Sequence, residues 1–195
     1  MAEPHGVIEA PSAWVTRWAG LMPPHGRVLD VACGGGRHTR WLAERGHAVD
    51  AVDRNAEAIA ALSGVKNVTA LCADLEGAGS VWPYAHAAGA YAGVVVTNYL
   101  HRPLFPLLID ALAPGGVLIY ETFALGNERF GRPSNPDFLL KPGELLECVR
   151  GRLQVHAFED VVVDAPRPAK VQRICAIRAT RTIGAITAIR ATNVA

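Results

Sequence analysis

The chain has 195 residues and a formal net charge of +1, and hydrophobic residues make up 50% of it. These values indicate one globular domain with a buried core, and they exclude the strongly basic surface of a nucleic-acid-binding protein. The four cysteines lack disulfide-scaffold density, the first ten residues lack a signal-peptide pattern, and no apolar run is long enough for a membrane span. We therefore expect a reduced, cytoplasmic protein.

Short β-rich runs alternate with helical patterns along the chain, which is typical of an α/β domain with a mostly parallel sheet. Helices are expected at residues 12–20, 37–45, 55–61, 103–113 and 144–149. Strands are expected at residues 27–32, 47–52, 67–73, 92–97, 117–122, 153–163 and 173–179, with a turn at residues 114–116.

Two segments fall outside this alternation. Residues 123–142 are rich in Gly, Pro and Asn, and a loop of this length is usually functional or disordered. The segment 180–195 has no acidic residue and either extends an edge strand or is disordered, and we favour disorder. We divide the chain into an N-terminal arm with a capping helix at 1–26, one domain at 27–179 and a tail at 180–195.

The most informative motif is VLDVACGGGRH at residues 28–38, where a hydrophobic strand runs through glycines into a helix. Such a turn lets a ligand approach the backbone at the helix N-terminus. A dinucleotide fingerprint needs a third glycine in the sixth position, and this chain has Arg37 or Thr39 there. A nicotinamide-dependent oxidoreductase is therefore a weaker interpretation than a protein that binds S-adenosylmethionine.

Polar residues follow the first four strands at the points where a nucleoside would need them. Asp30 suits the ammonium and sulfonium groups of S-adenosylmethionine on charge grounds. Asp53 ends the second strand, where a carboxylate can accept hydrogen bonds from ribose hydroxyls. Asp74 can accept from the adenine amino group while Leu75 lines the ring, and Asn98 ends the fourth strand near the expected reversal of strand order.

Taken in order, residues 27–122 resemble the class I S-adenosylmethionine-dependent methyltransferases, including the run LAPGGVL before the fifth strand. The resemblance implies a Rossmann-like three-layer α/β sandwich: a mostly parallel, seven-stranded sheet with an antiparallel last strand. It implies S-adenosyl-L-methionine as cofactor, and the subgroup it resembles is the small bacterial tellurite-resistance type. The implied cofactor-binding residues are Asp30, Ala32, Cys33, Gly34, Gly36, Asp53, Arg54, Asp74, Leu75 and Asn98. Many members of the family have glycine where this chain has Ala32.

Candidates for the acceptor side follow the fourth and fifth strands. The predicted catalytic residues are Tyr99, His101 and Glu121, of which His101 is a possible general base because its reference pKa lies near neutrality. Packing, helix capping and ion pairing remain alternatives for these residues. The predicted substrate contacts are Arg102, Tyr120, Arg129 and Arg132; the last two lie in the loop 123–142, which we expect to fold over an acceptor.

The sequence therefore predicts a methyltransferase that transfers a methyl group in line to a small-molecule acceptor, because no inserted domain is present to bind a macromolecule. The alternative is a non-catalytic protein that binds S-adenosylmethionine and acts in regulation. We expect no nucleic-acid or membrane partner, a monomer or homodimer, and no metal, because the seven histidines lack metal-ligand spacing.

Overall fold

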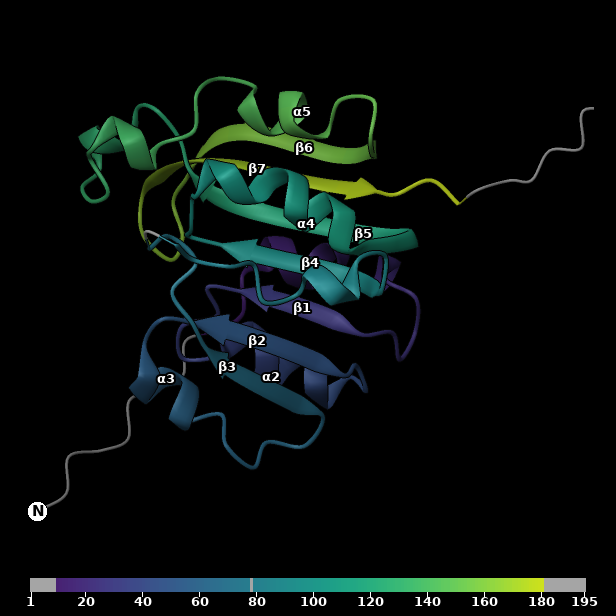
Figure 1. The fold of residues 1–195 in the computed structure, drawn as a ribbon. Coiled ribbons are helices and arrows are strands. Elements are labelled where there is room, and N and C mark those ends of the chain that lie inside the picture. Colours follow the sequence, from purple (N-terminus) through teal and green to yellow (C-terminus); the bar gives the residue numbers. More distant parts are fainter. Residues whose placement is uncertain (1–9, 78, 181–195) are drawn as a thin grey trace, which may run out of the picture.

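A computed structural model describes residues 10–77 and 79–180. Seven strands form one sheet in the order β3-β2-β1-β4-β5-β7-β6 (Figure 1). The strands are β1 Val28–Val31, β2 Val49–Asp53, β3 Val68–Cys72, β4 Tyr91–Thr97, β5 Leu112–Phe123, β6 Gln154–Val163 and β7 Ala169–Ile177. The first five strands pair in parallel and β7 pairs antiparallel with β5 and β6. The predicted fold class, with its antiparallel last strand, is confirmed.

Helices cover both faces of the sheet and complete the three layers. The α-helices are α1 Ala13–Trp18, α2 Arg37–Glu44, α3 Ala56–Ala60, α4 Phe105–Ala111 and α5 Glu144–Val149. The helices α4 and α5 lie on the near face in Figure 1. Buried side chains of α1 and α2 pack together on the other face, against β1, β4 and β5. Among the described residues, no helix has the length and apolar character needed to cross a membrane.

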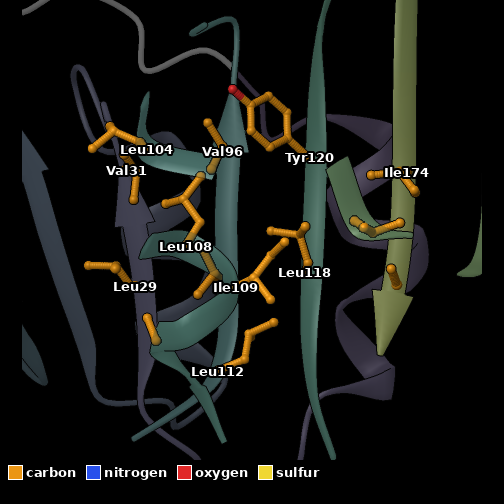
Figure 2. Close-up of a cluster of buried hydrophobic side chains, with 14 of the residues drawn as sticks. Leu29, Val31, Val96, Leu104, Leu108, Ile109, Leu112, Leu118, Tyr120 and Ile174 are labelled. Atoms are coloured by element: carbon orange, nitrogen blue, oxygen red, sulfur yellow. The ribbon is translucent and has the colours of Figure 1, made fainter. Parts of the chain in front are cut away.

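The sheet centre is hydrophobic on both sides. Every residue of β4 is buried, as expected for a parallel strand with helices on both of its faces. Figure 2 shows side chains of β1, β4, β5 and β7 that point toward the α4 side of the sheet, where Leu108 and Ile109 meet them. This packing fixes the sheet as a rigid support for the loops at its edge.

Strand register brings the ends of four parallel strands together. Val31 lies between Val52 and Val96 in the sheet, and Val52 also pairs with Leu71. The residues that follow β1, β2, β3 and β4 therefore meet along one edge, at the point between β1 and β4 where the strand order reverses. Ligands of open α/β sheets bind at such a point.

The structure corrects several predicted boundaries. The predicted turn at 114–116 lies inside β5, where the register moves from Tyr91–Leu112 to Gly93–Val117 and the chain forms a bulge. The loop 123–142 is ordered, because it contains the short 3-10 helices Asn127–Arg129 and Pro136–Phe138 and a bridge between Ala124 and Leu140. Residues 181–195 of the predicted tail and residues 1–9 of the arm lie outside the described residues, and the domain division stays a prediction.

Candidate functional site

A cavity of about 240 Å³ opens at the edge where β1 to β4 end. Its lining residues come from the segments that follow these strands: Ala32, Asp53, Arg54, Ala73, Asp74, Leu75, Glu76, Asn98 and Tyr99. Six of them are predicted cofactor-binding residues and Tyr99 is a predicted catalytic residue. Ala73 and Glu76 were missed, although both adjoin the predicted pair Asp74 and Leu75 in sequence.

The glycine turn follows β1 and contributes Ala32 to the cavity lining, whereas Gly34 and Gly36 are not lining residues. Ala32, Gly34 and Gly36 have φ values of 53°, 52° and 78°, which is the left-handed region. A Cβ on Gly36 would lie 2.4 Å from the Leu62 side chain, so glycine is required there both for its conformation and for close packing. At Gly34 no other atom lies within 4 Å of a built Cβ, which leaves space above the backbone.

Asp53 joins the glycine turn to the end of β2. Its Oδ2 accepts a hydrogen bond from the Gly34 backbone N–H at 2.8 Å, and its Oδ1 accepts from the Asn55 N–H at 2.8 Å. Each carboxylate oxygen can accept two hydrogen bonds, so the carboxylate retains acceptor capacity toward the cavity. Asn55 in turn caps α3 by accepting from the N–H groups of Glu57 and Ala58.

The segment after β3 contributes Ala73, Asp74, Leu75 and Glu76 to the lining. Asp74 is exposed, and its Oδ1 accepts from the Glu76 N–H at 2.9 Å, while its carbonyl accepts from the Ser80 hydroxyl at 2.8 Å. Leu75 is buried beside it and supplies an apolar surface. A carboxylate next to an apolar side chain matches the edge and face of a nucleobase.

Backbone strain is concentrated at this cavity. Four non-glycine residues have positive φ in the described part of the chain, and two of them, Ala32 and Asn98, line the cavity. Asn98 has a φ of 55°, and its N–H donates to the Glu121 carbonyl at 2.9 Å. Strained backbone of this kind clusters at functional sites.

Tyr99 and His101 are neighbours in sequence but face different cavities. Tyr99 lines the first cavity, and burial together with the nearby Glu76 carboxylate raises the pKa of its hydroxyl, which therefore stays protonated. His101 lines a second cavity of about 170 Å³, with Trp82 and Leu107. The two cavities share Leu75 and Glu76.

Three other predicted residues, Arg102, Glu121 and Tyr120, form hydrogen bonds with other residues of the chain. Arg102 pairs with Glu144 through Nε at 2.6 Å and donates to the carbonyls of Asp137 and Leu139. Both carboxylate oxygens of Glu121 accept hydrogen bonds, one from the Ser12 hydroxyl at 2.7 Å and one from Arg173 at 3.1 Å.

Tyr120 is fully buried, and its hydroxyl donates to the Tyr99 carbonyl at 2.8 Å. Neither cavity is lined by Arg102, Glu121 or Tyr120. Tyr120 instead supports the backbone of Tyr99 from behind.

Asp30 and Cys33 lie beneath the glycine turn, outside the cavity lining. Asp30 is 1% exposed and accepts from the Thr39 hydroxyl at 2.6 Å, and burial raises its pKa to about 7. Cys33 packs with Ala51 and Leu62, and burial raises the pKa of its thiol. A carboxyl and a thiol in these positions support the turn.

The remaining predicted substrate residues, Arg129 and Arg132, are exposed on the loop 123–142. Asn127 is buried at the base of this loop; its amide donates to the Pro133 carbonyl and accepts from the Lys170 N–H. In the described ranges, no group of three or more His, Cys, Asp or Glu side chains could hold a metal ion.

Residues 28–116 match a family model described as a methyltransferase domain. The match spans β1 to β4 with the glycine turn and all the lining residues of the first cavity, and the sheet has the seven strands and the antiparallel last strand that the resemblance implies. Over these residues the chain is similar to the methyltransferase family, and its fold is that of the class I S-adenosylmethionine-dependent methyltransferases. This similarity supports methyltransferase activity with S-adenosylmethionine as the methyl donor.

Solved structures share the fold at low sequence identity. TehB from Haemophilus influenzae has a TM-score of 0.68 at 20% identity; the match covers 84% of this chain and 61% of TehB. An S-adenosylmethionine-dependent methyltransferase from Mesorhizobium loti has a TM-score of 0.63 at 19% identity, over 85% of this chain and 98% of that one.

A third structure is the geranyl diphosphate C-methyltransferase from Streptomyces coelicolor, with a TM-score of 0.62 at 18% identity, over 85% of this chain and 75% of that one. At these identities the likeness shows the fold alone. No curated protein matches the sequence.

Proposed function

We propose that this methyltransferase binds the nucleoside of S-adenosylmethionine in the first cavity and transfers the methyl group in line to a small-molecule acceptor. The observation that supports this best is the pair of carboxylates, Asp53 and Asp74, which come from the ends of neighbouring strands and line one cavity beside the glycine turn. The residues fit the donor chemically, because hydroxyl and amino groups of a nucleoside need acceptors, and an apolar ring face needs Leu75.

Each lining residue then has a role. Asp53 accepts from the ribose hydroxyls, Asp74 accepts from the adenine amino group, and Leu75 packs on the ring. Arg54 and Asn98 close the sides of the cavity. The glycine turn offers backbone N–H groups to the amino-acid half of the donor, and Asp30 and Cys33 hold that turn from below.

When bound, S-adenosylmethionine would supply an electrophilic methyl carbon on its positively charged sulfur, and S-adenosylhomocysteine would leave with the electron pair of the carbon–sulfur bond as the acceptor took that methyl group. The chain's contribution is to hold donor and acceptor in line, which can lower a barrier by about 7–11 kcal/mol. Tyr99 keeps its proton and is therefore a hydrogen-bond donor toward the acceptor. His101 is the candidate base if the second cavity admits the acceptor's polar group.

A small acceptor is supported by the architecture of the described residues, whose helices and strands form one three-layer unit around a single sheet, with no separate domain there to bind a macromolecule. One structure of the same fold holds geranyl diphosphate, a small apolar molecule with an anionic end. In this chain the exposed pair Arg129 and Arg132, with the exposed ring of Phe130 between them, would suit an acceptor of mixed anionic and apolar character.

Titration calorimetry with S-adenosylhomocysteine tests the donor site. We expect Asp53→Ala to weaken binding by about 1.5–3 kcal/mol, roughly 10- to 150-fold, the cost of losing charge-assisted hydrogen bonds. Glu44→Ala, an exposed carboxylate at the far end of α2, is the matched control and should bind normally. Equal affinity of the two variants would contradict the ribose assignment.

Turnover tests the acceptor class. A panel of thiols, phenols, amines and oxyanions should release S-adenosylhomocysteine with at least one member. Turnover restricted to a protein or nucleic-acid acceptor would overturn the small-molecule proposal.

A further inference from the structure

Ser12, the residue immediately before α1, makes three separate hydrogen bonds. The Ser12 hydroxyl accepts from the Trp14 N–H at 3.1 Å, so it caps α1, and it donates to Glu121 at 2.7 Å. The Ser12 backbone N–H donates to His38 Nε2 at 3.0 Å. The start of α1 is thus fixed both to β5 and to α2, and neither contact belongs to the proposed donor cavity.

His38 is the residue through which these elements meet. It is the second residue of α2, two positions after Gly36 in the glycine turn, and it is 1% exposed. Because Ser12 N–H can only donate, His38 Nε2 must carry a lone pair, which leaves the proton on Nδ1, 3.4 Å from the Thr97 hydroxyl. Burial lowers the pKa of His38 to about 3, in agreement with this neutral form.

A second contact brings the same segment to the start of α2. The Arg37 guanidinium donates to the Ala10 carbonyl at 3.5 Å, a long hydrogen bond. Two consecutive residues of the first turn of α2 therefore contact the segment 10–12. Thr97, the second partner of His38, immediately precedes Asn98 in the cavity lining. His38 consequently connects the glycine turn, the end of β4 and the start of α1.

We propose that His38 is a positioning residue that couples the glycine turn to α1, so that occupancy of the donor site strengthens the docking of α1 on the sheet. The inference rests on the proposed function, because the coupled ligand is the donor. A ligand that restrains the first turn of α2 also restrains His38 Nε2, the atom that accepts the hydrogen bond from Ser12 N–H. Coupling between two sites is reciprocal, so a docked α1 in turn favours donor binding.

Hydrogen exchange measured by mass spectrometry tests the coupling without any acceptor. In the full-length protein, saturating S-adenosylhomocysteine should slow exchange of the α1 amides by about three- to tenfold, the equivalent of one buried hydrogen bond. His38→Leu removes the acceptor atom and should abolish this ligand-dependent slowing. His38→Gln should restore it, because the amide oxygen can accept from Ser12 N–H.

Two controls separate this role from general stability. His47→Leu alters another buried histidine, bonded to the Gly26 carbonyl at the other end of α2, and should leave the ligand effect intact. Ser12→Pro removes the N–H at a residue whose φ of −55° suits proline, and Ser12→Ala removes the hydroxyl alone. The ligand effect should be lost in Ser12→Pro and retained in Ser12→Ala, and these variants do not alter α2.

The outcomes are distinguishable. If S-adenosylhomocysteine binds but exchange in α1 does not change, the coupling is wrong and the proposed function stands. The coupling is also wrong if His38→Leu keeps the full ligand effect. If His38→Leu does not fold, Ser12→Pro gives the same test. If S-adenosylhomocysteine does not bind the unmodified protein, the proposed function and this inference are both wrong.

Discussion

The two sides of the sheet edge differ in how their polar groups are used. On the donor side, the carboxylates of Asp53 and Asp74 line a cavity and have capacity left for a ligand. On the acceptor side, Arg102 and Glu121 are engaged by other side chains and backbone groups. The difference teaches that chemically suitable residues beside a cavity can serve to hold its walls, while Asp53 and Asp74 keep acceptor capacity toward it.

The largest change in the free energy of unfolding is expected from a substitution in the glycine turn. Gly36→Ala adds a methyl group 2.4 Å from the Leu62 side chain at a φ of 78°. It should lower the free energy of unfolding by about 2–4 kcal/mol, from overpacking together with left-handed strain. Urea denaturation measures this.

Gly34→Ala is the matched control for Gly36→Ala, because its φ is 52° and no atom crowds its built Cβ. It should cost only about 1–2 kcal/mol, from the left-handed conformation alone. Equal costs for the two variants would show that contact with Leu62 does not determine the shape of the turn.

On the acceptor side, Arg102→Ala should destabilise the fold without changing donor affinity. The expected loss is about 1–3 kcal/mol, because Glu144 and two carbonyls lose their donor while solvent screens part of the charge. Arg150→Ala, which breaks the exposed pair with Glu147, should change stability little. Unchanged stability with weaker substrate binding would instead make Arg102 a binding residue.

The pH dependence of stability should separate the two buried groups around the glycine turn. The pKa of Asp30 is raised to about 7, so its contribution is complete below the unfolded pKa of 3.8 and is lost as pH rises through about 7. The pKa of His38 is lowered to about 3, so its contribution is complete above 6.5 and is lost as pH falls toward 3. Between pH 5 and 7 the two effects oppose each other.

Denaturant titrations at pH 5, 6 and 7 therefore test both groups. Asp30→Asn should make the free energy of unfolding rise more steeply with pH, and His38→Gln should make it rise less steeply. Each slope should change by about 1 kcal/mol per pH unit. Parallel slopes for the two variants would contradict the opposite protonation states assigned to Asp30 and His38.

The smallest effect is expected at Ala32, a non-glycine residue with positive φ in the glycine turn. Its φ of 53° is unfavourable for alanine, so Ala32→Gly should raise stability by up to about 1 kcal/mol after the entropic cost of glycine. Asn67→Gly, with a φ of 63° away from the cavity, is the comparison and should gain less, because asparagine tolerates this region. Thermal unfolding of both variants measures the difference.

Sequence patterns were sufficient for the sheet and for most of the residues that line the first cavity. Hydrophobic runs bounded by turns predicted all seven strands, and the position of Asp53, Asp74 and Asn98 after three of these strands follows from parallel register. Glu76 was missed because an exposed acid two residues after Asp74 carries no pattern of its own.

The acceptor side was less accessible to sequence reasoning, because its contacts are long-range. Arg102 meets Glu144 and the loop 123–142 only after α4, β5 and the loop have folded, and His101 and Tyr99 diverge because the chain turns between them. Ser12 and His38 lie 26 residues apart in the sequence, and nothing in either local sequence predicts their contact.

A crystal structure with S-adenosylhomocysteine bound tests the central claim most directly. The account predicts the ribose hydroxyls on the Asp53 carboxylate and the adenine between Asp74 and Asn98, over Leu75. A nucleoside found instead in the second cavity, against Trp82 and His101, would contradict it.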